Sequence, residues 1–143
     1  LQSVRSRAPW LLLNLATAIL ASGVIAMFEA SIASKVALAV LMPIVASMGG
    51  NAGTQSLAVA VRSIAERDLT AANAARVVWR ELATGVLNGL IFALVMAGVT
   101  IVWFSDYELA AIIAIAMVLN LACAGLSGIL IPLGLMRVGA DPA

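Results

Sequence analysis

Four long apolar runs dominate this sequence and limit the folds that it can adopt. They cover residues 10–28, 36–61, 82–104 and 109–136. Each run has roughly the 20 residues that an α-helix needs to cross the hydrocarbon core of a bilayer. In lipid every backbone amide needs an internal partner, which helices provide and open sheets do not. With 64% hydrophobic and 10% charged residues, the sequence predicts an all-α, polytopic membrane helix bundle with four transmembrane helices, in one domain over residues 1–143.

The charged residues outside these runs predict how the chain is oriented in the membrane. One set of flanking segments, at both ends of the chain and between the second and third runs, holds Arg5, Arg7, Arg62, Arg67, Arg76, Arg80 and Arg137. The opposite set of loops holds one basic residue, Lys35, together with acidic residues such as Glu29 and Asp106. Loops rich in Lys and Arg stay in the cytoplasm. We therefore expect a multi-pass membrane protein with both ends of this chain on the cytoplasmic side.

The second apolar run is unusual because its centre, MGGNAGTQS, is small and polar. At helical spacing its residues fall into two stripes. The first stripe is polar or bare backbone and contains Pro43, Ser47, Gly50 and Thr54, with Asn51 beside them. The second stripe is small and contains Gly49, Gly53, Ser56 and Ala60. Small stripes let another helix approach closely, and polar groups at bilayer depth must be buried in protein or line water. The pattern fits a water-lined path, and it also fits a kinked helix held by packing and interhelical hydrogen bonds.

The motifs of several other function classes are missing from the sequence. It has no histidine, one cysteine at position 123, and no phosphate-binding Gly-rich loop. No arrangement of a nucleophile with a base is visible. The sequence therefore predicts that the protein is not an enzyme, and we expect no nucleic-acid partner.

The segment PIVASMGGNAGTQS resembles the signature of the MgtE family of magnesium transporters and channels. The segments RAPWLLLNL, RELATGVLNGL and LGLMRVGADPA resemble this family's first helix entry, its third helix and the link after its fourth. The resemblance implies a homodimer in a bacterial inner membrane. It also implies passive flow of Mg²⁺, the transported ion, along a pathway at the subunit interface that the second and fifth membrane helices line.

The same resemblance implies which residues line that pathway. Its candidates are Gly50 through its carbonyl oxygen, Asn51, and Thr54, where some relatives have Asn. Ser47 lies one turn away and would extend the lining. Because Mg²⁺ tends to keep its waters, carbonyl and hydroxyl oxygens can recognise the hydrated ion without a complete protein cage.

Two parts of the family pattern are not present in these residues. The resemblance implies a cytosolic regulatory region with paired CBS domains and a fifth membrane helix that carries the pore aspartate, so we expect the sequence to be a piece of a longer protein. The four apolar runs contain no Asp or Glu. Since a cation at bilayer depth is costly without a compensating charge, we expect the formal negative charge to come from outside this chain.

The remaining polar residues have less specific predictions. Asn14, Asn88 and Asn120 are expected to form interhelical hydrogen bonds. Glu81, at the inner mouth of the third run, could attract cations or pair with Arg80 or a neighbouring arginine. Two alternative functions stay open: a secondary transporter for another small solute or cation, because Gly and Pro interrupt the second run, and a membrane scaffold that transports nothing.

Overall fold

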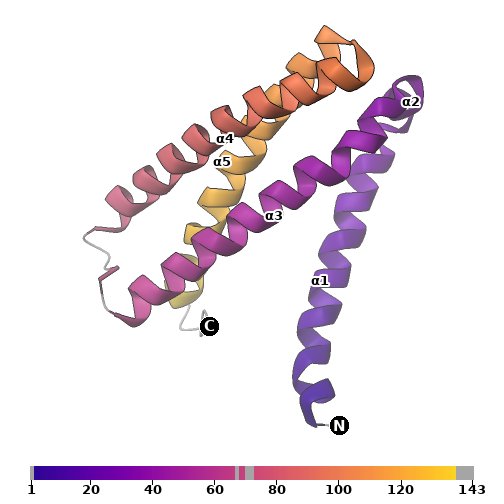
Figure 1. The fold of residues 1–143 in the computed structure, drawn as a ribbon. Coiled ribbons are helices and arrows are strands. Elements are labelled where there is room, and N and C mark those ends of the chain that lie inside the picture. Colours follow the sequence, from indigo (N-terminus) through magenta and orange to yellow (C-terminus); the bar gives the residue numbers. More distant parts are fainter. Residues whose placement is uncertain (1, 67, 70–72, 138–143) are drawn as a thin grey trace. The chain divides into compact units, whose positions relative to one another are not determined.

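The described part of the protein consists of α-helices and the short segments that connect them. The computed structural model describes residues 2–66, 68–69 and 73–137, so Arg67 of the orientation prediction lies outside the described residues. The helices are α1 (Gln2–Ala26), α2 (Glu29–Ser34), α3 (Val36–Ala65), α4 (Ala74–Phe104) and α5 (Tyr107–Arg137) (Figure 1). These residues contain no strand, which confirms the prediction of an all-α fold.

Four of these helices are long and apolar enough to cross a membrane, as predicted from the four apolar runs. They are α3, α4, α5 and the part of α1 from Arg7 to Ala26. The apolar run at 82–104 lies in α4. This helix starts at Ala74, before the run begins. Glu81 therefore lies inside α4, about two turns from its first residue.

The chain divides into two compact units, Leu1–Ala39 and Val40–Ala143. In the first unit the backbone amides of Met27 and Phe28 donate to carbonyls of the last turn of α1, and Phe28 accepts from Ile32 at the start of α2. The chain thus passes from α1 into α2 through a hydrogen-bonded turn. Large apolar side chains of α1, such as Trp10 and Leu20, are exposed. A helix that is apolar all round is typical of a membrane span, where such side chains face lipid.

In the second unit, α4 and α5 form an antiparallel hairpin with a short connection (Figure 1). Ser105 ends α4 in the left-handed conformation, with φ of 52°, and its amide donates to the Ile101 carbonyl at 2.9 Å. Asp106 then accepts a 2.9 Å hydrogen bond from the amide of Leu109 in the first turn of α5. A left-handed residue after one helix and an Asp before the next satisfy free backbone groups at both ends, so two residues reverse the chain.

Glycines hold α4 and α5 at close distance. A Cβ placed on Gly85 would lie 2.8 Å from the Leu121 carbonyl oxygen, and one on Gly89 would lie 2.8 Å from the Val118 Cα. Both glycines are buried. The G-x-x-x-G pair of α4 therefore packs directly on the backbone of α5, in the way that small residues serve membrane helices.

The small stripe of α3 packs on α5, and the two helices run parallel. Gly49 lies against Asn120, Gly53 against Ala124, and Gly128 of α5 against Ser56. At the far end of α3, Ala60 joins a buried apolar cluster whose other members are Leu69, Ile129, Ile64, Val77, Val78 and Leu133. The prediction that this stripe is the packing face of the helix is confirmed.

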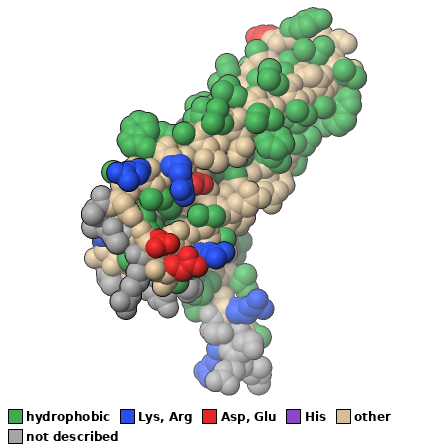
Figure 2. All heavy atoms as spheres, turned by 60° about the vertical axis from the view of Figure 1, so that its left-hand side comes forward, with side chains coloured by type: hydrophobic (Ala, Val, Ile, Leu, Met, Phe, Trp, Pro, Cys, Tyr) green, Lys and Arg blue, Asp and Glu red, His purple; other side chains and the backbone are tan. Residues whose placement is uncertain are grey.

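The charged side chains of the second unit are concentrated at one end. Figure 2 shows hydrophobic side chains over most of the upper part of the visible face and most of the charged groups toward its lower part. The segment between α3 and α4 and the adjoining turns contain Arg62, Glu66, Asp68, Arg76 and Arg80. Such a distribution is expected when the apolar length lies in hydrocarbon and the charged end lies at the headgroups.

Candidate functional site

The four predicted pathway residues lie on one face of α3. Ser47, Gly50, Asn51 and Thr54 are all exposed, and Pro43 on the same stripe is exposed as well. These four residues stay exposed among the described residues of their unit, whereas Gly49 and Ser56 on the other stripe are buried. α3 continues as a helix through Pro43. This polar face, defined by Ser47, Gly50, Asn51 and Thr54, is referred to below as the α3 polar face.

Packing within the unit does not explain the glycine at position 50. A Cβ built on Gly50 would have no atom within 4 Å, whereas one on the neighbouring Gly49 would meet the side chain of Asn120, with its Cγ at 2.8 Å. Glycine in a helix interior costs about 1 kcal/mol relative to alanine. The two adjacent glycines therefore have different surroundings, and only Gly49 has a packing reason within this unit.

The hydroxyl of Thr54 turns back onto its own helix. Its oxygen lies 3.0 Å from the Gly50 carbonyl oxygen and 2.9 Å from that of Asn51. A threonine hydroxyl has one hydrogen, which these two carbonyls share, and two lone pairs that stay available as acceptors. Thr54 thus presents an acceptor oxygen on the α3 polar face while it partly satisfies the Gly50 carbonyl that the family resemblance implicates.

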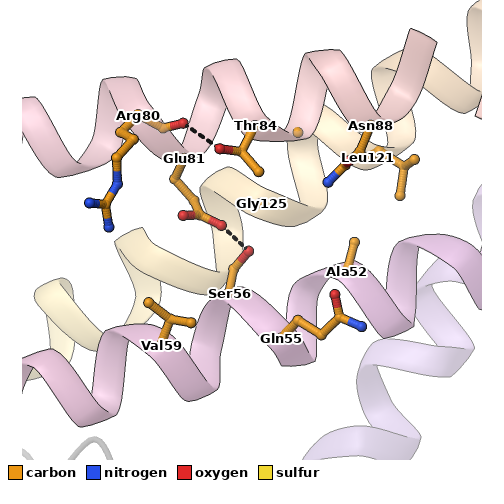
Figure 3. A pocket seen from close by; sticks show the side chains of 11 residues that line it. Ala52, Gln55, Ser56, Val59, Arg80, Glu81, Thr84, Asn88, Leu121 and Gly125 are labelled. Atoms are coloured by element: carbon orange, nitrogen blue, oxygen red, sulfur yellow. Dashed lines mark hydrogen bonds between the residues drawn. The ribbon is translucent and has the colours of Figure 1, made fainter. Parts of the chain in front are cut away.

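Beside the polar face, a cleft of about 320 Å³ opens between α3 and α4 (Figure 3). Its polar lining consists of Gln55, Ser56, Arg80, Glu81, Thr84 and Asn88. The Ser56 hydroxyl donates a 2.5 Å hydrogen bond to the Glu81 carboxylate, which ties α3 to α4 across the cleft. This group of side chains, with the cleft that it lines, is called the Glu81 cleft.

The structure corrects one prediction for Glu81 and separates the predictions for the asparagines. Within the described part of the chain, the Glu81 carboxylate is paired with Ser56 and with no arginine, so pairing with Arg80, one of the two alternatives predicted for Glu81, is not formed. Asn120 forms the predicted interhelical bond, since its Nδ2 donates to the Val45 carbonyl at 2.6 Å. Among the described residues Asn88 makes no hydrogen bond and lies in the cleft instead, and the Asn14 side chain makes none within its own unit.

Sequence reasoning did not predict the cleft, although a signal for it exists. Glu81, Thr84 and Asn88 follow each other at intervals of three and four on α4, which places them on one helix face. Gln55 lies four residues after Asn51, or about 40° around α3 by ideal helix geometry. The cleft and the α3 polar face are therefore neighbours on the same helix.

The residues of the Glu81 cleft can hold a hydrated cation more readily than a bare one. No group of three or more His, Cys, Asp or Glu side chains occurs among the described residues, so a cage of charged ligands is not formed there. Mg²⁺ usually keeps several waters and takes one or two carboxylates from the protein. One carboxylate with hydroxyl and amide oxygens around it meets that requirement.

Comparison with known proteins matches residues 42–143 to the MgtE family, described as divalent cation transporter. The chain is also similar to proteins named magnesium transporter MgtE. The relative from Bacillus subtilis is 35% identical over 137 residues, which are 96% of this chain and 30% of the relative. Those from Enterococcus faecalis and Thermus thermophilus are 35% and 32% identical, over 100% and 96% of this chain and 32% and 30% of their own lengths. The chain thus spans about a third of the length of these relatives.

Proposed function

This chain belongs to the MgtE family of divalent cation transporters, and we propose that it forms membrane helices of a protein through which Mg²⁺ crosses the cell membrane passively, down its electrochemical gradient. The α3 polar face is the observation that carries the proposal. It exposes Ser47, Asn51 and Thr54 on an apolar helix, where unpartnered polar groups at bilayer depth are costly unless water or protein covers them. A water-lined path meets this requirement.

A second copy of the chain gives the path its other wall. Because the unit of α3 to α5 leaves the α3 polar face uncovered, two copies facing each other would enclose a polar channel between two such faces. A homodimer is therefore proposed, with Gly50 where two helices and a hydrated ion must pass close together. The absence of any side chain at Gly50, which packing within the unit does not require, supports this role.

The ion would pass with its hydration shell largely intact. Mg²⁺ releases water reluctantly, and its first-shell waters donate hydrogen bonds to carbonyl, amide and hydroxyl oxygens. The Thr54 hydroxyl uses its hydrogen on the helix backbone, so its oxygen is left to accept from such a water. Ser47 and Asn51 offer oxygens of the same kind on the same face, and the Gly50 carbonyl can accept from a water when the Thr54 hydroxyl donates to the Asn51 carbonyl.

In the proposed orientation both ends of the chain and the segment between α3 and α4 face the cytoplasm. The arginines near that segment support this placement through the preference of basic loops for the cytoplasmic side. A cytosolic regulatory region with CBS-type domains, which the family resemblance implies, would then adjoin the charged end of the unit.

A secondary transporter for another small solute or cation is the alternative. Such transporters typically build the substrate site from discontinuous helices. α3 runs as a helix from Val36 to Ala65 through Pro43 and its glycines, which favours the passive pathway over this alternative.

Substitution of Thr54 tests the proposal in the intact protein. Thr54→Leu should lower Mg²⁺ uptake strongly in a bacterial strain that depends on the introduced transporter, with folded protein at the normal level. Thr54→Ser is the matched control and should keep uptake, because it retains the hydroxyl. Normal uptake by Thr54→Leu would contradict the assignment of the α3 polar face.

Cysteine cross-linking tests the proposed dimer separately. In a Cys123→Ala background, Ser47→Cys should form a disulfide between two copies in native membranes. Cross-linking at the exposed Leu94 of α4, mutated to Cys, serves as the comparison and should be weaker. Efficient cross-linking at 94 with none at 47 would argue for a different interface.

A further inference from the structure

The Glu81 cleft places a carboxylate directly before the apolar run at 82–104, although the four runs themselves contain none. Glu81 lies inside a helix that is long and apolar enough to cross the membrane, and it is half-buried. Of its two carboxylate oxygens, one accepts the hydrogen bond from Ser56. Several lone pairs of the carboxylate are thus left to face the cleft.

The cleft surrounds this carboxylate with neutral oxygen atoms. Gln55 and Asn88 contribute amides, and neither makes a hydrogen bond within the described residues. Thr84 donates its hydroxyl hydrogen to the Arg80 carbonyl at 2.9 Å, so its oxygen keeps its acceptor capacity. In Figure 3 these side chains and Ser56 come from both helices toward the same space. The arrangement offers one formal negative charge and several acceptors.

The size of the cleft suits an ion that keeps its water. Each water occupies about 30 Å³ in the liquid, so an octahedral shell of six waters fills about 180 Å³. The cleft of about 320 Å³ has room for that shell, while a site for a bare ion would need ligands at about 2.1 Å. An apolar ligand is disfavoured, since it would leave the carboxylate and the amides without partners.

We propose that the Glu81 cleft is a binding site for a hydrated divalent cation within a single subunit, with the Glu81 carboxylate contacting the ion through its waters. The inference rests on the proposed function for the class of ion. It assigns to this chain a negative charge beside the pathway, on the neighbouring face of α3. On that helix the cleft residue Gln55 adjoins Asn51 of the α3 polar face.

Arg80 places a positive charge beside the proposed site, opposite in sign to the Glu81 carboxylate. Its guanidinium group lies at the end of the cleft away from Asn88 (Figure 3), and its side chain is exposed. A positive charge at the rim opposes cation binding through space, and solvent screening weakens this opposition. Removal of the Arg80 charge should therefore strengthen cation binding, whereas removal of the Glu81 charge should weaken it.

Direct binding of Mn²⁺, measured by electron paramagnetic resonance on the purified chain in nanodiscs, tests the site without any transport assay. Glu81→Gln should weaken Mn²⁺ binding about tenfold or more, since loss of a group that acts through the ion's water shell costs 10–100-fold in metal affinity. Glu81→Asp should retain part of the affinity, and added Mg²⁺ should displace the Mn²⁺. The matched control is Glu66→Gln, which removes a carboxylate that is paired with Arg62 outside the cleft and should leave the affinity unchanged.

Arg80→Gln keeps the test decisive if Glu81→Gln does not fold, because this exposed residue is not needed for packing. It should tighten Mn²⁺ binding, and equal or weaker binding would overturn the proposal. Unchanged Mn²⁺ affinity in folded Glu81→Gln would overturn it as well. Failure of the proposed pathway would look different: uptake would persist in Thr54→Leu while Mn²⁺ binding still depended on Glu81.

Discussion

The adjacent glycines Gly49 and Gly50 allow a matched test of how α3 is packed. Both lie in the interior of α3, and both can be changed to alanine with the same gain in intrinsic helix propensity, about 1 kcal/mol. That gain cancels when the two variants are compared. The difference in stability between Gly49→Ala and Gly50→Ala therefore reports only what each new methyl group meets.

The structure sets the size of this difference. At position 49 the added Cβ would lie 2.8 Å from the Asn120 Cγ, so the Asn120 side chain must rotate away from the helix. It would then lose its 2.6 Å hydrogen bond to the Val45 carbonyl. Interhelical hydrogen bonds of this kind contribute about 0.6 kcal/mol on average and up to about 1.7 kcal/mol.

At position 50 the added Cβ would have no atom of the chain within 4 Å. We therefore expect Gly49→Ala to be less stable than Gly50→Ala by about 0.6–1.7 kcal/mol. The free energy of unfolding can be measured for both variants on dissociated subunits, without the partner proposed to face Gly50, by SDS titration in mixed micelles followed by circular dichroism. If the two values agree within about 0.5 kcal/mol, the usual effect of a surface substitution, then Gly49 does not pack on α5 as described.

Three further predictions concern the packing and the orientation of the chain. Gly89→Ala should destabilise the protein by about 1–3 kcal/mol because its methyl group overlaps the α5 backbone. Gly98→Ala is the control and should not destabilise it, since the added methyl group meets no atom within 4 Å. Equal unfolding free energies for the two variants would contradict the close contact of α4 with α5. Ser56→Ala should lower the free energy of unfolding by about 1.5 kcal/mol, because it removes the hydrogen bond to the Glu81 carboxylate. The same titration measures this, and an unchanged value would show that the bond does not tie α3 to α4. A cysteine at position 107 in a Cys123→Ala background should react with an impermeant thiol reagent from outside the cell, and reaction only from the cytoplasmic side would reverse the proposed orientation.

Much of the fold could be predicted from the sequence because the bilayer leaves few choices. An apolar run of about 20 residues must satisfy its own backbone hydrogen bonds, so the four runs had to be helices. Periodicity then assigned the faces of α3: Gly49 and Gly50 are neighbours in sequence, yet they fall on different stripes, and the structure buries the first and exposes the second. The pathway residues were predicted on the same basis, together with the family resemblance, and their role stays a proposal.

The Glu81 cleft depends on contacts that only the tertiary structure decides. Ser56 and Glu81 are separated by 25 residues and belong to different helices, and Asn120 reaches Val45 across 75 residues. The pattern on one helix shows which side chains share a face but not which neighbour that face meets, nor how far the helix is rotated against it. Hydropathy places Glu81 just before the third apolar run, whereas α4 begins at Ala74. Hydropathy marks where a helix is apolar, and the end of a helix is set by its local hydrogen bonds and packing.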